Sequence, residues 1–374
     1  MHCNIISKDI EEISRNDIVQ QTAFWASVKH RQGLDPVAFN YDVESELLYP
    51  GSDKRSHVEG DILVLIKYID DVHCIATIPY GPVSEPVFEN QGPFLEELSE
   101  VLRLKLPAGC ILIRYDLPWE NQWSADEDYY DENGIWKGPP AFNSQEFRVN
   151  FNTHNWNLVK SRSDNLPSNT IFLDLKKGDD DLLRNMKPKT RYNIRLSSRR
   201  GVRVHSYGME MLDTWYELYT ETAIRNGVTL HGKEYFQSVL SSYHETHTPG
   251  VEIRLLMAEH EGEYLAAMFL VISNKRASYL YGASSSRKRN LMATYAIQWE
   301  AMRIAMAEGC TAYDLFGVAP NPNPSHPMHG LYRFKSGFGG EMYHRMGCWD
   351  YPLDELQYQA FQAQEVTGQS YHVH

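Results

Sequence analysis

Two cations stand among aromatic residues near the C-terminal end of the chain, in the segment 330–340 with the sequence GLYRFKSGFGG. A segment that only fills a core has little use for Arg333 and Lys335, whereas a pocket for an anionic ligand or a developing oxyanion needs such charges. The composition therefore predicts a site in which Lys335 stabilises negative charge and Arg333 contributes to substrate binding.

A second group of cations is spaced for a helix. Lys187, Arg191, Arg195 and Arg199 recur every four residues, so they share one face of a helix predicted to begin at Pro188 and to be capped near residue 201. Such a face is suited to the phosphates of RNA. The alternative is a solvated face that is neutralised by the three aspartates at 179–181.

The composition limits the remaining possibilities. The net charge of -13 opposes non-specific nucleic-acid binding over the whole surface, so any RNA contact has to be local. The five cysteines form no CxxC pair, which argues against a disulfide framework and against a metal site. The longest apolar runs, 62–66 and 268–272, are too short to cross a bilayer, and the N-terminus has no signal-peptide pattern. We expect a cytoplasmic enzyme without stable membrane insertion, with peripheral attachment at the inner membrane face as the open alternative.

The elements that position these residues follow a pattern that occurs twice. In each half, two strand-like runs lead to a Tyr-Gly pair, and then a helical stretch leads to a strand that ends in an aspartate. The spacing from Gly81 to Gly109 is 28 residues, and that from Gly282 to Gly309 is 27. The repetition predicts two α/β domains of the same architecture.

The predicted boundary lies in the polar stretch 160–169. It divides the chain into a first domain at 1–165, a second at 166–346, and a C-terminal segment at 347–374 that is expected to pack back on the first domain. The acidic, aromatic stretch 119–142 is expected to be an insertion on the first domain.

Several blocks resemble the Fem peptidyltransferases (FemABX), which transfer amino acids from aminoacyl-tRNA to the stem peptide of peptidoglycan. The blocks occur in the family's order over most of the chain, so together they are more specific than any one of them. They are 24–29, 78–82, 186–201, 279–284, 313–318 and 331–340.

This resemblance implies a fold of two tandem GNAT-like (acetyltransferase-like) domains with the substrate cleft between them. Residues 209–251 have room for two ordinary helices and contain no heptad run, so the chain is similar to the members that lack a coiled-coil arm, such as FemX. The resemblance also implies aminoacyl-tRNA as co-substrate, no bound cofactor, and a muramyl-pentapeptide precursor as acceptor, either nucleotide-linked or lipid-linked.

The resemblance further implies binding residues. Lys29 matches a family lysine that binds the diphosphate of the precursor. In the second domain the family often places an arginine four residues before a tyrosine for the same diphosphate. Here Tyr235 is present and His231 takes the earlier position, with less charge near neutral pH and no bidentate fork. Tyr279 and Tyr281 alternate along a predicted strand, so both are expected to face one side and line the cleft.

For the reaction, the amine of the stem peptide attacks the ester of aminoacyl-tRNA through a tetrahedral oxyanion. Lys335 is predicted to stabilise that charge. Asp116, at the end of a first-domain strand, is predicted to accept the amine proton or to orient the nucleophile. It is also a normal turn residue before Leu117 and Pro118.

Two other functions remain open at this point. One is an N-acyltransferase that uses acyl-CoA, but the segment 287–294, where a GNAT enzyme needs glycines to approach the pyrophosphate, contains none. The other is a non-catalytic relative that only binds the precursor or a cell-wall partner, against which the presence of Lys335 argues.

Overall fold

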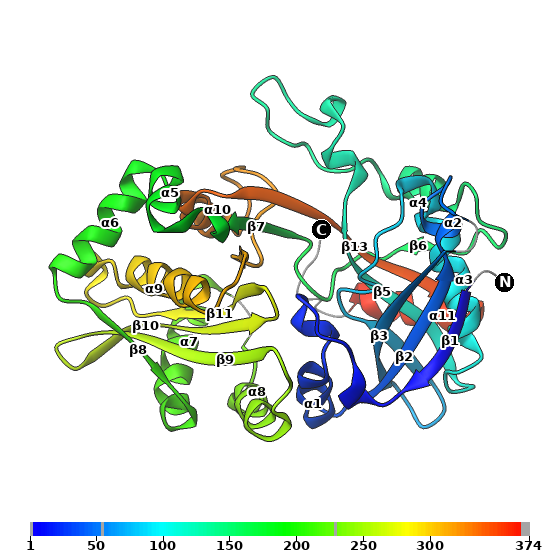
Figure 1. Cartoon of the computed structure of the whole chain (residues 1–374), viewed down its shortest axis with the longest axis horizontal. Coiled ribbons are helices and arrows are strands. Elements are labelled where there is room, and N and C mark those ends of the chain that lie inside the picture. The colour runs from blue at the N-terminus through cyan, green and yellow to red at the C-terminus, as the bar shows by residue number, and fades with distance from the viewer. Residues whose placement is uncertain (1–2, 54–55, 228–229, 368–374) are drawn as a thin grey trace. The chain divides into compact units, whose positions relative to one another are not determined.

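A computed structural model describes residues 3–53, 56–227 and 230–367 (Figure 1). The chain forms two compact units. Unit 1 contains the residues up to Ser14, Gln20–Ser168 and the residues from His344 onward, and unit 2 contains Arg15–Val19 and Asn169–Tyr343. The main division after Ser168 lies three residues beyond the predicted boundary, and the C-terminal part of the chain belongs to unit 1.

The sheet of unit 1 has the strand order β1-β2-β3-β4-β5-β13, and the short β6 (Val159–Lys160) also pairs with β13. Neighbouring strands are antiparallel except for the parallel pair β4 and β5. The strands are β1 Cys3–Lys8, β2 Asp35–Glu44, β3 His57–Tyr68, β4 Cys74–Ile78, β5 Cys110–Glu120 and β13 Glu341–Pro352.

One helix of unit 1 forms the crossover between the parallel strands. This is α3 (Gln91–Arg103), whose residues Phe94, Leu95 and Leu98 are buried in the main core against the strands. A further core lies where Tyr358 packs on residues of β4 and β5. The other helices of this unit are α1 Ala23–Arg31, α2 Ser45–Leu48, α4 Phe142–Asn150 and α11 Glu355–Thr367.

The contact between α3 and α4 depends on a residue without a side chain. A Cβ atom at Gly92 would lie 1.8 Å from the carbonyl oxygen of Val149 in α4. Any other residue at Gly92 would therefore push the two helices apart.

The sheet of unit 2 has the order β7-β12-β11-β10-β9-β8, with the single parallel pair β11 and β12. The helix α9 (Ala293–Ala307) joins these two strands, as α3 joins β4 and β5. The strands are β7 Asn169–Asp174, β8 Arg203–Tyr207, β9 Val251–His260, β10 Glu263–Ser273, β11 Arg276–Ser284 and β12 Ala312–Asp314.

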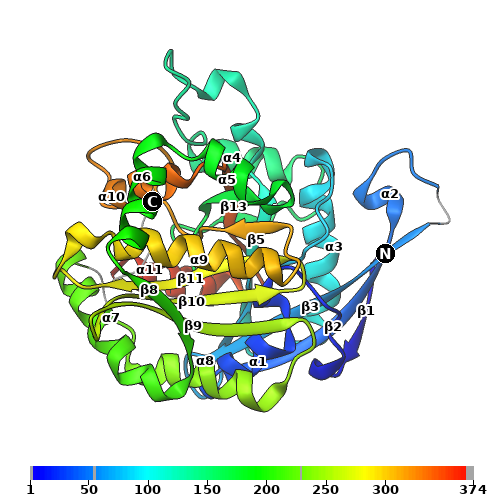
Figure 2. The ribbon, with the colours of Figure 1, turned by 60° about the vertical axis from the view of Figure 1, so that its left-hand side comes forward.

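Alternation along β10 places helices on both faces of this sheet. Met268 and Leu270 are buried with α9, which lies along one face (Figure 2), while Phe269 points to the other face and contacts Trp215 and Phe236. The remaining helices of unit 2 are α5 Gly178–Asn185, α6 Pro188–Arg199, α7 Leu212–Asn226, α8 Lys233–Thr246 and α10 His329–Lys335.

The predicted α/β repeat is therefore confirmed as strand, helix and parallel strand in each unit. The segment 209–251 forms the two ordinary helices α7 and α8, as predicted. One detail is wrong. The strand expected to end at Asp116 continues to Glu120, because β13 pairs with it as far as that residue. None of the helices in the described part of the chain is long and apolar enough to span a membrane.

Candidate active site

Lys335 is the last residue of α10 and is 4% exposed. Its Nζ donates hydrogen bonds to the carbonyl oxygens of Phe316, at 3.1 Å, and Gly317, at 2.7 Å. The amine also lies 5.1 Å from the centre of the Tyr279 ring. An ammonium has three donors, so these two carbonyls fix its direction and leave one donor for another acceptor.

The turn that supplies these carbonyls is itself held by a carboxylate. Asp314 Oδ1 accepts a hydrogen bond from the backbone N–H of Phe316 at 2.7 Å and a short one from the hydroxyl of Thr170. Phe316 has a φ of 58°, a left-handed conformation that is costly for a bulky residue and is kept only where its surroundings enforce it. The turn thus holds two carbonyl oxygens toward the amine.

Burial lowers the pKa of Lys335 to about 7, although the nearby Asp314 carboxylate acts in the opposite direction. Near neutral pH the amine therefore exists in both protonation states, and its charge lies in a medium of low dielectric constant. Arg333, two residues earlier on the same short helix, is exposed. The structure separates the two cations of the 330–340 segment, and only Lys335 is enclosed.

Sequence analysis did not identify the residues that position Lys335. The backbone of Phe316 and Gly317, the Asp314 carboxylate and the Thr170 hydroxyl all belong to this arrangement. The block 313–318, which contains Asp314, Phe316 and Gly317, resembles the family, but this resemblance did not indicate a function for these residues.

The expected shared face for Tyr279 and Tyr281 is wrong. The register between β10 and β11 shifts so that Phe269 lies opposite Tyr281 while the next residue, Leu270, lies opposite Tyr279. This bulge breaks the alternation. Tyr279 packs with the core on the α9 face, whereas Tyr281 contacts Phe269 on the other face.

The side chain of Tyr279 crosses over Gly282. A Cβ atom there would lie 1.6 Å from the phenol oxygen of Tyr279, so this position of the ring, beside Lys335, requires a glycine at 282. The Tyr-Gly pair at 281–282 therefore has a packing role that is distinct from a turn.

Tyr281 belongs to a second group, which includes both residues of the predicted diphosphate site in unit 2. The hydroxyl groups of Tyr235 and Tyr281 lie 2.5 Å apart, and the ring of His231 stacks on Tyr235 with centroids 4.2 Å apart. Burial raises the pKa of Tyr235 to about 12. The structure thus brings His231, Tyr235 and Tyr281 together on one face of the sheet, and Tyr279 lies on the other face.

Lys29 lies in the last turn of α1. Its Nζ donates to the side-chain oxygen of Gln32 at 2.9 Å and stands 4.9 Å from the Trp25 ring centre. Burial lowers its pKa to about 8. The diphosphate-binding role of Lys29 stays a prediction.

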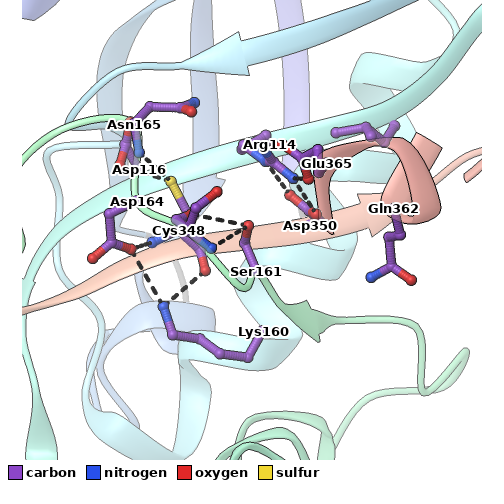
Figure 3. Close-up of polar contacts among 12 residues, drawn as sticks. Arg114, Asp116, Lys160, Ser161, Asp164, Asn165, Cys348, Asp350, Gln362 and Glu365 are labelled. Carbon is purple, nitrogen blue, oxygen red and sulfur yellow. Dashed lines mark hydrogen bonds and ion pairs between the residues drawn. The ribbon is translucent and has the colours of Figure 1, made fainter. Parts of the chain in front are cut away.

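Asp116 lies inside the unit 1 sheet, between β4 and β13, and is fully buried (Figure 3). Its Oδ1 accepts a hydrogen bond from the thiol of Cys348 at 2.9 Å, while Oδ2 has no hydrogen-bond partner among the residues that the structure describes. Asp164 accepts the backbone N–H of Cys348 at 2.7 Å and lies 3.6 Å from Lys160. These contacts favour a structural role for Asp116, and its proton-accepting role stays a prediction.

The buried carboxyl has a measurable consequence for stability. Burial raises the pKa of Asp116 from 3.8 to about 7, and the negative charge of Asp164 contributes to the shift. Because the pKa of this carboxyl is higher in the folded state than in the unfolded state, protonation of Asp116 stabilises the fold. This contribution is fully present below pH 3.8 and is lost as the pH rises through about 7. Asp116→Asn removes this pH-dependent loss. From acid to alkaline pH, the free energy of unfolding of the variant should therefore rise relative to that of wild type by on the order of a few kcal/mol.

Urea unfolding of both proteins at pH 5 and pH 8 measures this change. Asp354→Asn, on the surface, is the matched control. A difference between wild type and Asp116→Asn that does not change with pH would contradict the titration of Asp116.

The predicted basic face of α6 is only partly present. Arg191 Nη1 donates to the carbonyls of Leu183, Arg184 and Met186, so this arginine caps the C-terminal end of α5. Lys187 is the N-cap residue of α6, and its Nζ donates to Ser336 Oγ.

Arg195 and Arg199 are exposed on α6. The preceding aspartates do not pair with them: Asp179 pairs with Arg303, and Asp181 pairs with Arg184. The exposed cations of this face within α6 are Arg195 and Arg199, whereas Arg191 is engaged with the end of α5. Binding of tRNA by this helix stays a prediction.

Comparison with known proteins gives consistent matches. A model of the FemAB family matches residues 151–249 and 251–365, more than half of the chain. Two curated relatives named "Lipid II:glycine glycyltransferase", from Staphylococcus haemolyticus (strain JCSC1435) and Staphylococcus aureus (strain USA300), are each 24% identical to the chain. The alignments cover 52% of this chain and 60% and 61% of those proteins, so they span less than two thirds of the relatives' length.

The crystal structure of FemX matches 96% of this chain and 100% of its own, with a TM-score of 0.71 and 18% identity. This likeness concerns the fold, and it confirms the predicted two-domain α/β architecture.

Proposed function

The chain belongs to the FemAB family, and from this membership we propose that it is an aminoacyltransferase of peptidoglycan synthesis. It transfers an amino acid from aminoacyl-tRNA to the stem peptide of a muramyl-pentapeptide precursor. The observation that carries this proposal is the enclosed Lys335, whose amine is directed by the carbonyls of Phe316 and Gly317.

In the proposed reaction the amine nitrogen of the stem peptide attacks the ester carbonyl carbon of aminoacyl-tRNA. The carbonyl oxygen becomes an oxyanion, and the Lys335 ammonium donates its remaining N–H to it. The C–O ester bond then breaks, the ribose hydroxyl leaves with a proton, and an amide is formed. The irregular stretch 315–328, between β12 and α10, supplies the two carbonyls that hold Lys335.

The acceptor is proposed to be lipid-linked. The two curated relatives are named for the glycyl transfer to Lipid II, and this chain shares their family. His231, Tyr235, Lys29 and the exposed Arg333 are the proposed precursor-binding residues. No cofactor enters this reaction.

The tRNA is proposed to contact the exposed cations of α6. Arg195→Glu combined with Arg199→Glu should weaken tRNA binding and lower the slope of log Kd against log salt concentration by about 1 to 2, because two phosphate contacts are lost. Filter binding over a salt series measures both quantities. Lys67→Glu with Arg162→Glu in unit 1 changes the net charge equally and is the control; an equal effect in both pairs would remove α6 from the tRNA site.

The proposed function is tested by transfer from a radiolabelled aminoacyl-tRNA pool. The nucleotide-linked and lipid-linked muramyl pentapeptides are offered separately, and acetyl-CoA is the competing donor. Label that moves from tRNA to the lipid-linked acceptor supports the proposal and identifies the amino acid. Transfer from acetyl-CoA alone would indicate an ordinary acyltransferase, and tight precursor binding without any transfer would indicate a binding protein.

A further inference from the structure

Three large aromatic side chains are more than half exposed and touch one another on unit 1. Phe147 lies on α4, Phe151 follows this helix, and Trp156 follows in the next loop; they are 60%, 57% and 51% exposed. The ring centres of Phe147 and Phe151 are 6.2 Å apart, and those of Phe147 and Trp156 are 5.8 Å apart. Single exposed apolar residues are normal, but a contiguous aromatic group marks a contact surface. We call these three residues the aromatic patch.

The loop that carries Trp156 is held in place by a buried acid. Glu96 of α3 accepts the backbone N–H groups of His154, at 2.7 Å, and Asn155, at 2.6 Å. Trp156 itself has a φ of 54°, which is unfavourable for a bulky side chain. The protein therefore holds Trp156 in a strained backbone conformation that exposes its indole ring. Such strain is typical of residues with a binding function.

The segment 142–157, which carries the aromatic patch, has few charged residues of its own, and Glu96 and Glu100 of α3 contact its loop. Charged residues make up 23% of the chain, but only Glu146 and Arg148 among the sixteen residues 142–157. The rest of this stretch is rich in asparagine, with five such residues. Glu146 accepts the backbone N–H of Lys160, and Arg148 pairs with Glu89, so both charges are engaged. Insertion of the rings into an apolar medium would thus require little removal of charge from water.

Two cations lie at the C-terminal end of α3, the helix that contacts the Trp156 loop. Asn155 contacts Glu100 at 3.5 Å, and Leu104, one helical turn further, is 74% exposed. Arg103, which pairs with Glu100 at 3.1 Å, and Lys105 flank this leucine. An exposed apolar side chain between two cations is suited to a surface with an apolar interior and anionic headgroups.

We propose that the aromatic patch, with Leu104 at its edge, binds the interface of a phospholipid bilayer. Aromatic rings partition into the boundary between headgroups and acyl chains, and the flanking cations attract anionic lipid. The choice of a bilayer over a protein partner rests on the proposed function, since a lipid-linked acceptor requires the enzyme to work at a membrane. The patch would hold the enzyme there through surface side chains.

Binding to vesicles tests this proposal without catalysis. The purified chain is sedimented with vesicles of phosphatidylglycerol and phosphatidylethanolamine, and with vesicles of phosphatidylcholine alone. The triple variant Phe147→Ser, Phe151→Ser, Trp156→Ser should bind the anionic vesicles at least about tenfold more weakly than wild type. The control triple variant Ile6→Ser, Val72→Ser, Ile224→Ser removes scattered exposed apolar side chains and should bind like wild type.

Tryptophan quenching by brominated lipid locates the contact. Wild type should be quenched by the vesicles, and Trp156→Phe should lose most of the quenching while it still binds. Absence of binding in wild type, or equal loss in both triple variants, would overturn the proposal. So would a patch variant that binds vesicles normally but loses self-association in sedimentation velocity, because the patch would then join two copies of the chain.

Transfer assays separate this inference from the proposed function. The patch variant should lose transfer to the lipid-linked acceptor in vesicles by about tenfold and keep transfer to the nucleotide-linked acceptor. If the protein binds vesicles through the patch but transfers no amino acid, the result supports the membrane-binding role of the patch and overturns the proposed reaction. Transfer to the vesicle-bound acceptor that is unchanged in the patch variant overturns the membrane role alone.

Discussion

Replacement of Lys335 by methionine is expected to lower kcat by about a hundredfold or more, with acceptor binding nearly unchanged. The expectation follows from the position of Nζ, which two carbonyls fix and which burial removes from water. Loss of one preorganised oxyanion donor typically costs about 100-fold to 1,000-fold in turnover. Methionine preserves most of the volume of the lysine stem, so the effect is not due to a cavity. Transfer kinetics with separate measurement of acceptor Kd provide the test.

The pH dependence distinguishes this role from a structural one. Because burial lowers the pKa of Lys335 to about 7, the ammonium that stabilises an oxyanion should be lost as the pH rises through this value. The rate is therefore expected to fall on the alkaline side. Lys335→Arg should retain activity and shift this decline to higher pH, since guanidinium stays charged. A rate that rises through pH 7 would instead assign Lys335 as a base, and unchanged activity in Lys335→Met would remove it from the reaction.

Replacement of Arg114 by methionine is expected to lower the free energy of unfolding by about 3 to 5 kcal/mol. Arg114 on β5 is buried, and its guanidinium makes two hydrogen bonds to Asp350 on β13, at 2.7 and 2.8 Å (Figure 3). The same group makes two more to Glu365 on α11, at 2.6 and 2.8 Å. Without it, the buried Asp350 carboxylate loses its cation and keeps the hydrogen bond from the hydroxyl of Tyr358, at 3.0 Å.

Denaturant unfolding with fluorescence detection measures this loss. Arg103→Met, which removes an exposed pair with Glu100, is the matched control and should change stability by less than about 1 kcal/mol. A similar small effect for Arg114→Met would show that the buried network contributes little. A restored stability when Asp350→Leu is added would identify the unpaired acid as the cause of the loss.

The sequence was informative where the determining interactions are local. The strand, helix and parallel strand of each unit recur at nearly equal spacing, because each crossover contains one helix of similar length, 13 residues in α3 and 15 in α9. The helix at Pro188–Arg199 begins at the proline that predicts it, and Gly201 follows with a φ of 77°. Such features depend on neighbours within a few residues.

The errors arise where a partner lies far away in the chain or where a regular pattern is interrupted. β5 extends beyond Asp116 because its neighbour β13 is supplied by residues more than two hundred positions later. Tyr279 and Tyr281 point to opposite faces because one bulge changes the period of two. Arg191 has the spacing of a phosphate-binding residue, but the end of α5 offers three carbonyls that it binds instead. No periodicity in the sequence carries this information.

The late arrival of β13 has a consequence for synthesis on the ribosome. The strands β7–β12 of unit 2 come from one stretch of chain, 169–314, so they can pair with one another once that stretch has emerged. Translation of unit 1 begins first, but its sheet stays incomplete, with one edge of β5 unpaired, until residues 344–352 have been translated. An open edge strand invites pairing with other chains. A nascent chain that stalls within unit 2 should therefore be a substrate for chaperones through its first domain, and the second domain is the part expected to become protease-resistant earlier.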